Sequence, residues 1–128
     1  MLKSTDNTLT RDIIAAQGHM MLSAKEIQDI FIQATITARY LYHNTWYIAK
    51  TNSYKDGRIE GQNNVGSYNK GRWSVDTTNN TLSLEWDGYW EDWTAIGYKV
   101  NDEFMFFDED SGKWRITLIL VEKGILPI

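Results

Sequence analysis

The run of residues 71–114, GRWSVDTTNNTLSLEWDGYWEDWTAIGYKVNDEFMFFDEDSGKW, decides the fold of this chain and contains five of its six tryptophans. Short apolar segments alternate in it with groups of turn-forming residues. This alternation is typical of consecutive antiparallel strands joined by tight connections. We predict four strands here, at residues 72–76, 81–86, 92–100 and 103–108. In the last one, Phe104 and Phe106 alternate with Met105 and Phe107, so we expect both of its faces to be covered.

The same alternation continues on both sides of this run. It predicts further strands at residues 35–41, 45–52, 58–65 and 113–122. Eight antiparallel strands with short connections close most simply into an up-and-down barrel, because closure removes the exposed edges. We therefore predict a mainly β domain of about eight antiparallel strands in an up-and-down barrel. An opened barrel or a two-sheet sandwich is the alternative.

One helix is predicted before the strands. Ser23 and Glu26 form a capping-box pattern, and apolar residues at helical spacing follow it over residues 24–33. Upstream, residues 17–20 (QGHM) resemble a cloning junction, so we expect residues 1–20 to be a leader and residues 21–128 to form the single domain. The alternative is a native N-terminal helix around residues 11–16.

Composition limits the possible functions. The 128 residues suffice for one domain with its own core. The absence of Cys excludes disulfides, thiolate–metal sites and cysteine nucleophiles. A net charge of −4 argues against binding nucleic acid through a basic face. Since no apolar run approaches the roughly 20 residues of a membrane helix, no membrane span is predicted.

Motifs for catalysis and metal binding are weak. The two histidines, His19 and His43, lie in different segments, and the acidic turn at residues 108–112 lacks the ligand spacing of a calcium loop. Carboxylates beside aromatic residues are typical of glycosidase sites, but Glu85 falls on a polar strand face and Glu91 lies in a turn. We therefore assign no catalytic residue, no metal ligand and no cofactor, and whether the chain is an enzyme stays open.

The aromatic residues carry most of the functional information. Four tryptophans are in phase with apolar strand faces and are expected mainly in the core: Trp46, Trp73, Trp86 and Trp114. Trp90 and Trp93 differ, because they follow a turn among acidic residues, where a core residue is less expected. Indole rings also suit partly hydrated pockets, since they combine an apolar face with one N–H donor. The candidate ligand-binding residues are Trp46, Trp73, Trp86, Trp90, Trp93 and Tyr98.

A family resemblance supports the barrel. The residues that carry it are Gly71, Trp73, Ser74, Val75 and Asp76, followed by Leu82, Leu84 and Trp86. With the preceding helix, they resemble small bacterial lipocalin-like β-barrel domains of unknown function, over roughly residues 22–121. Many members carry cysteines near the second motif, where this chain has Ser83. The resemblance implies a lipocalin-like barrel and a periplasmic or secreted location, and it supplies no catalytic residue.

Three functions are compatible with these observations. The leading hypothesis is non-catalytic binding of a small hydrophobic or aromatic ligand inside the barrel. The second is a protein-interaction module, an inhibitor or an assembly domain, whose exposed aromatics contact a protein partner or a second copy of the chain. The third is a barrel enzyme whose catalytic residues the sequence does not identify.

Overall fold

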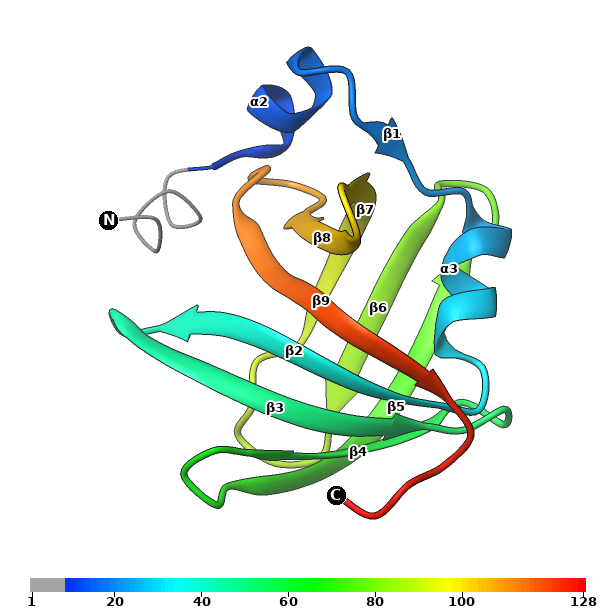
Figure 1. The fold of residues 1–128 in the computed structure, drawn as a ribbon, viewed down its shortest axis with the longest axis vertical. Helices are drawn as coiled ribbons and strands as arrows, with labels where there is room; N and C mark the ends of the chain where they lie inside the picture. Colours follow the sequence, from blue (N-terminus) through cyan, green and yellow to red (C-terminus); the bar gives the residue numbers. More distant parts are fainter. Residues whose placement is uncertain (1–8) are drawn as a thin grey trace.

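The computed structural model describes residues 9–128 and contains a closed antiparallel barrel with one additional short strand (Figure 1). The barrel strands are β2 (Ala34–Tyr42), β3 (Thr45–Ser53), β4 (Arg58–Asn63), β5 (Tyr68–Asp76), β6 (Thr81–Trp86), β7 (Trp93–Val100), β8 (Glu103–Asp108) and β9 (Trp114–Lys123). Each strand pairs with its neighbours in the sequence, and β9 pairs with β2 to close the ring. The predicted up-and-down barrel is therefore confirmed.

The strand boundaries agree with the prediction to within a few residues. The largest difference is in β5, which begins at Tyr68 instead of residue 72, because Tyr68 and its neighbours pair with β4. The additional strand, β1 (Met20–Met21), pairs with the end of β7 beyond the point where β6 leaves it. Two residues are too few to show an alternating pattern, so β1 has no signal in the sequence.

Two helices precede the barrel instead of the single one predicted. In α3 (Ala24–Phe31), Ser23 Oγ accepts the Glu26 amide and Glu26 accepts the Ser23 amide, so the predicted capping box is present. The helix ends two residues before the prediction, since Gln33 has a φ of 49° and leaves the helical conformation. The other helix is α2 (Arg11–Ala16). Among residues 9–128, neither helix is long and apolar enough to cross a membrane.

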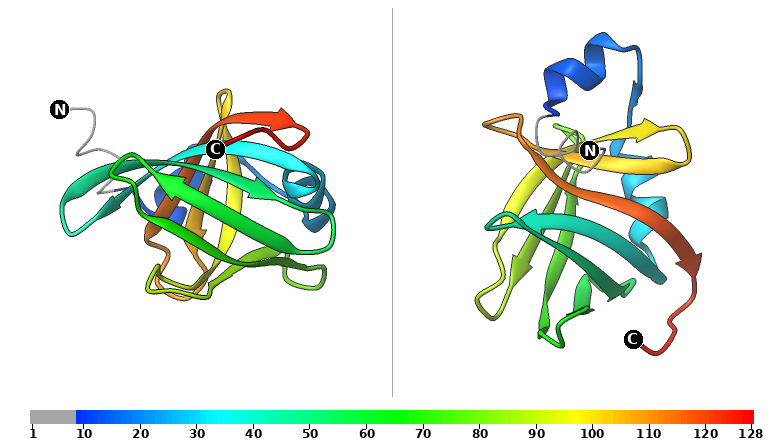
Figure 2. Two further views of the ribbon diagram at one scale, coloured as in Figure 1. Left: turned by 90° about the horizontal axis from the view of Figure 1, so that it is seen from below. Right: turned by 60° about the vertical axis from the view of Figure 1, so that its left-hand side comes forward.

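The main core lies inside the barrel, and α3 covers one end of it (Figures 1 and 2). Phe31 at the end of α3 packs against Trp73 of β5 and Phe106 of β8, with ring centroids 5.8 and 6.3 Å apart. Ser53 Oγ donates to the Phe31 carbonyl oxygen, which fixes the helix end on β3. This end of the barrel is therefore closed by packed aromatic residues.

A second, smaller core lies outside the barrel, between α2 and the outer face of β7 and β8. It contains Ile14 of α2 together with Tyr98, Met105 and Phe107. Both faces of β8 are thus covered, as its sequence predicts, with Phe106 in the main core. Residues 9–21 include part of the expected leader, and they pack on the barrel through Ile14 and through β1.

Candidate functional site

The candidate site is a cavity of about 260 Å³ inside the barrel. Phe31 of α3 lies at its closed end, together with the buried Ile36, Ile59 and Leu118. The other end opens where the loop between β6 and β7 meets the β2–β3 and β4–β5 hairpins. There the lining includes Tyr89 and Val65, whose relative exposure is 84% and 67%.

The cavity exists because one wall of the barrel carries small side chains. Ala38 of β2 lies directly opposite Ala49 of β3, and Thr51 of β3 lies opposite Gly61 of β4. All but Gly61 line the cavity, and Gly61 lies under the ring of Trp90. In a closed barrel of this size, large inward side chains would fill the interior. Three adjacent strands with small inward residues leave space that the aromatic residues opposite do not fill.

The open end is lined by aromatic side chains from several elements. The Trp86 and Trp90 rings meet at 66°, with centroids 4.7 Å apart. Trp90 extends across the barrel: a Cβ at Gly61 would lie 3.1 Å from its Cζ3 atom. Its Nε1 donates to Ser67 Oγ at 2.9 Å, and Ser67 Oγ also lies 3.1 Å from the Tyr89 hydroxyl. Trp90 is therefore oriented into the cavity by a hydrogen bond to the β4–β5 hairpin.

The loop that carries Trp90, residues 87–92, is held at three further points. Asp92 Oδ1 accepts the Trp86 amide at 2.7 Å and so closes the loop on itself. Asn69 Oδ1 accepts the Gly88 amide at 2.9 Å, and the Lys70 carbonyl accepts the Asp87 amide at 2.7 Å. Since these bonds connect the loop to β5, the position of Trp90 is defined before any ligand arrives.

A second aromatic group faces the loop from β2 and β3. The Tyr40 and Tyr47 rings are stacked, with centroids 5.4 Å apart and planes 13° from parallel. Asn63 Nδ2 donates to the Tyr40 hydroxyl at 3.3 Å. Burial raises the pKa of Tyr40 above its ordinary value, so the phenol stays protonated at neutral pH.

One arginine lies at the mouth of the cavity between two carboxylates. Arg115 Nη2 contacts Asp108 Oδ1 at 3.2 Å, and its Nη1 contacts Glu91 Oε1 at 3.3 Å. Burial raises the pKa of the Asp108 carboxyl, but the hydrogen bonds from Ser111 and Arg115 outweigh it and hold that pKa below its usual range. Asp108 is therefore ionised at neutral pH, and the positive charge of Arg115 is compensated.

Three of the six predicted ligand-binding residues line the cavity: Trp86, Trp90 and Trp93. Trp73 does not, although it points inward. It is only 7% exposed, packs against Phe31 beyond the closed end, and donates through Nε1 to the Tyr54 carbonyl at 2.8 Å. Its hydrogen bond is satisfied by backbone and its faces by core residues, so the structure places it in the core.

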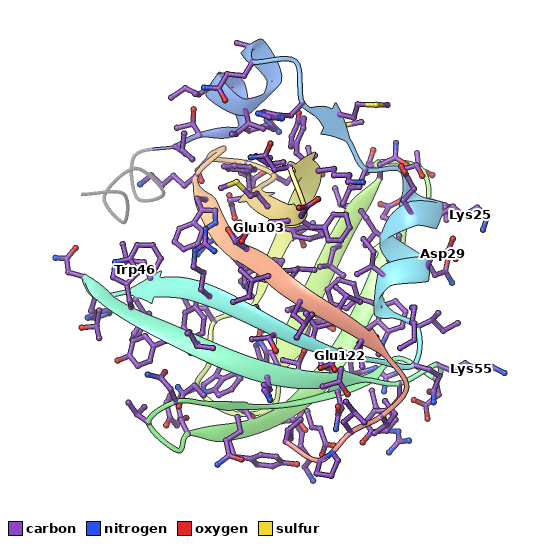
Figure 3. All side chains as sticks on the ribbon, in the orientation of Figure 1. Lys25, Asp29, Trp46, Lys55, Glu103 and Glu122 are labelled. Atoms are coloured by element: carbon purple, nitrogen blue, oxygen red, sulfur yellow. The ribbon has the colours of Figure 1, made fainter. Side chains whose placement is uncertain are left out.

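Trp46 and Tyr98 lie outside the barrel interior. On β3 the inward residues are Tyr47 and Ala49, so Trp46 faces outward, where its ring centroid lies 5.5 Å from that of Trp114. Figure 3 shows Trp46 at the end of the β2–β3 hairpin farthest from α3. Tyr98 lies in the second core under α2. Neither residue lines this cavity, and the aromatic residues of their strands that do line it, Tyr47 and Trp93, lie on the opposite faces.

The sequence reasoning missed several cavity residues, among them Tyr40, Tyr47, Tyr89, Glu91 and Arg115. The Arg115 guanidinium lies at the cavity mouth. A usable signal was present in the small residues Ala38, Ala49 and Gly61, which recur in three successive strands. Their alignment depends on register, and the sequence alone does not give it.

No group of three or more potential metal-ligating side chains occurs within residues 9–128. His43 lies exposed in the turn between β2 and β3. The carboxylates at the mouth, Glu91 and Asp108, are both held by Arg115 and do not face each other across the cavity. The site offers apolar contact, ring stacking and a few hydrogen bonds.

Comparisons of the chain with protein-family models, with curated proteins and with solved structures found no match. The function is therefore argued from the geometry and chemistry of the cavity itself.

Proposed function

We propose that this protein binds a small hydrophobic or aromatic ligand, without catalysis, in the barrel cavity. The observation that carries the proposal is a cavity with a packed apolar floor and an open end lined by Trp86, Trp90 and Trp93. Ligand sites are typically concave and apolar, with a few placed polar groups. The hydrogen bonds that hold the 87–92 loop support a site that is largely preformed.

The volume limits the size of the ligand. A cavity of roughly 150 Å³ lined by apolar residues binds benzene, and drug-sized ligands occupy pockets of about 300–1,000 Å³. At about 260 Å³, this cavity lies between the two. It suits compounds of one or two rings, and a long-chain lipid would extend out of the mouth.

The proposal is tested with α-methylstyrene, a planar apolar probe with nine non-hydrogen atoms. Isothermal titration calorimetry should give a Kd on the order of 0.1 mM, which is about 0.6 kcal/mol per non-hydrogen atom and lies within the range for small ligands. Burial of apolar surface should also give a negative change in heat capacity.

A matched pair of substitutions on β3 shows whether the probe enters the barrel. Ala49→Leu fills the cavity and should abolish binding. Lys50→Leu adds the same side chain on the exposed outer face and should leave binding unchanged. If the parent protein binds no probe, or if both variants bind equally well, ligand binding in this cavity is ruled out.

A protein-interaction function is the second candidate, and the exposure of Tyr89 and Val65 at the cavity mouth favours it. Large apolar side chains that protrude together are typical of interface anchors. Trp90 is less suited to that role, because it turns into the cavity. Analytical ultracentrifugation tests self-association: a dimer that Tyr89→Ala dissociates would support this function, and a monomer at all concentrations would exclude a homodimer.

A further inference from the structure

The Tyr40 hydroxyl is a polar group of the cavity whose hydrogen-bonding capacity is only half used. It is half-buried and lines the cavity, and it accepts a hydrogen bond from Asn63 Nδ2 at 3.3 Å. Among residues 9–128, its own proton has no acceptor. A phenol both donates and accepts, so one half of its hydrogen-bonding capacity is unused in a partly desolvated place. An unused donor there favours a ligand that carries an acceptor.

The orientation of Asn63 fixes which half is unused. Its Oδ1 accepts the Val65 amide at 3.1 Å and the Ser67 amide at 2.9 Å, and these two bonds hold the β4–β5 hairpin. The side-chain oxygen is therefore committed to backbone, and the side-chain nitrogen faces Tyr40. Because Asn63 donates, the Tyr40 oxygen is the acceptor and its O–H group is left to donate.

The Tyr40 ring is also held in place. It stacks on Tyr47, which lies directly opposite it in the β2–β3 ladder. Stacking in this register limits rotation of the ring, so the hydroxyl stays at the cavity wall. A donor held in this way costs little entropy when a ligand binds.

The Trp90 indole, Ser67 and Arg115 near the mouth are already engaged. Trp90 Nε1 donates to Ser67, and Ser67 also lies within hydrogen-bond distance of the Tyr89 hydroxyl. Arg115 lies between Asp108 and Glu91. A ligand carboxylate would have to displace one of these protein carboxylates, and it would meet the remaining negative charge at close range. The cavity mouth therefore disfavours anions.

We propose that the ligand is a neutral compound of one or two rings with a hydrogen-bond acceptor, such as a ketone, an ester or a ring nitrogen. The acceptor takes the proton of Tyr40, and the ring lies against Trp86 and Trp90. This inference rests on the proposed function and adds the chemical class of its ligand. It excludes free carboxylic acids, which are anionic at neutral pH.

Three probes of nearly equal shape separate these properties. Acetophenone has a carbonyl acceptor, α-methylstyrene has a methylene group in place of the oxygen, and benzoate is the anion. Each is titrated by calorimetry against the parent protein, Tyr40→Phe and Tyr47→Phe. Tyr47→Phe is the comparison, because Tyr47 lines the same wall and its hydroxyl, which makes no hydrogen bond within residues 9–128, is the competing donor.

The expected result is largest for one variant and one probe. Tyr40→Phe should weaken acetophenone binding by roughly threefold to tenfold, the range for one hydrogen bond. The same change should leave α-methylstyrene binding unchanged or slightly stronger, and Tyr47→Phe should weaken acetophenone binding less than Tyr40→Phe does. Benzoate should bind the parent protein at least about tenfold more weakly than acetophenone, as expected for a charge left unpaired near the mouth.

Two outcomes would overturn the inference. If Tyr40→Phe changes acetophenone and α-methylstyrene binding by the same factor, the hydroxyl does not recognise an acceptor, although ligand binding itself stands. If benzoate binds as well as acetophenone, the compensated charge of Arg115 does not exclude anions. Failure of all three probes would instead reject the proposed function and the inference with it.

Discussion

The two ends of the barrel use the same kinds of side chain in different environments. At the closed end, Trp73 is buried between strands and α3, and its indole N–H donates to the backbone carbonyl of Tyr54. At the open end, Trp90 is carried by a loop, and its indole N–H donates to the side chain of Ser67. One indole completes the core and the other lines an unfilled space.

The difference shows that the residue type does not decide the role of a tryptophan. Trp73 is surrounded because Phe31 of α3 fills the space beside it. Trp90 lies against Gly61 and lines the cavity, so part of its ring faces unfilled space. The element that carries the ring, and the size of the residues opposite, determine whether it stabilises the fold or offers a surface to a ligand.

The largest expected effect is on stability at the closed end. Trp73→Ala should lower the free energy of unfolding by about 3–5 kcal/mol, because it removes a large buried side chain and leaves a cavity. Trp90→Ala should cost less than about half of that, since one side of its ring already faces an unfilled space. Urea denaturation measures both. Equal costs would contradict the distinction between the two ends.

The open end should instead govern affinity. Trp90→Ala should weaken α-methylstyrene binding by roughly threefold to tenfold, the range for the loss of one aromatic contact. Ile48→Ala is the control, because Ile48 is exposed on the outer face of β3, does not line the cavity and should not change the Kd. Calorimetry gives both values, and a larger loss with Ile48→Ala would move the site outside the barrel.

A carboxylate on the outer face of β4, that of Glu60, should also affect the stability at acid pH. Glu60 accepts hydrogen bonds from Tyr54 at 2.6 Å, Tyr68 at 2.9 Å and Asn52 at 3.2 Å, and Asn52 also holds the Leu126 carbonyl. The hydrogen bond from Tyr54 is the main reason that the pKa of Glu60 is lowered. A lowered pKa means that the ionised form stabilises the folded state.

The contribution of ionised Glu60 to the free energy of unfolding is fully present above the unfolded-state pKa of about 4.3. It is lost as the pH falls through the lower folded-state pKa. Glu60→Gln should therefore lower the stability at pH 7 by about 1 kcal/mol, allowing for partial exposure, and should reduce its dependence on pH below about 4.3. Urea denaturation as a function of pH tests this. If the free energy of unfolding of Glu60→Gln depends on pH below about 4.3 as strongly as that of the parent protein, Glu60 does not contribute to the acid sensitivity.

The smallest effect is expected at the ion pair of the open end. Glu91→Gln removes one partner of Arg115, but the pair is exposed and Asp108 remains. The free energy of unfolding should change by less than about 0.5 kcal/mol, as for other surface pairs. A loss of more than about 1 kcal/mol in the free energy of unfolding would mean that this ion pair is more rigid and more desolvated than its side-chain exposures of 30% for Arg115 and 59% for Glu91 indicate.

Local patterns predicted most of the fold, but only three of the residues that line the cavity, Trp86, Trp90 and Trp93. Alternation determined the eight strands, and the Ser23–Glu26 capping box located α3, because both signals lie within a few residues. The cavity arises from small residues that meet across strands, such as Ala38 and Ala49, and this depends on register. The burial of Tyr98 depends on α2, which is distant in the sequence.

The central claim is that the open end binds ligand and the closed end does not, and the indole N–H signals of the tryptophans test it most directly. Two-dimensional ¹H–¹⁵N spectra are recorded with increasing α-methylstyrene. The signals of Trp86 and Trp90 should move in proportion to saturation, while the signal of Trp73 stays in place. If Trp73 moves as far as Trp90, or if no indole signal moves at saturating probe, the account is contradicted.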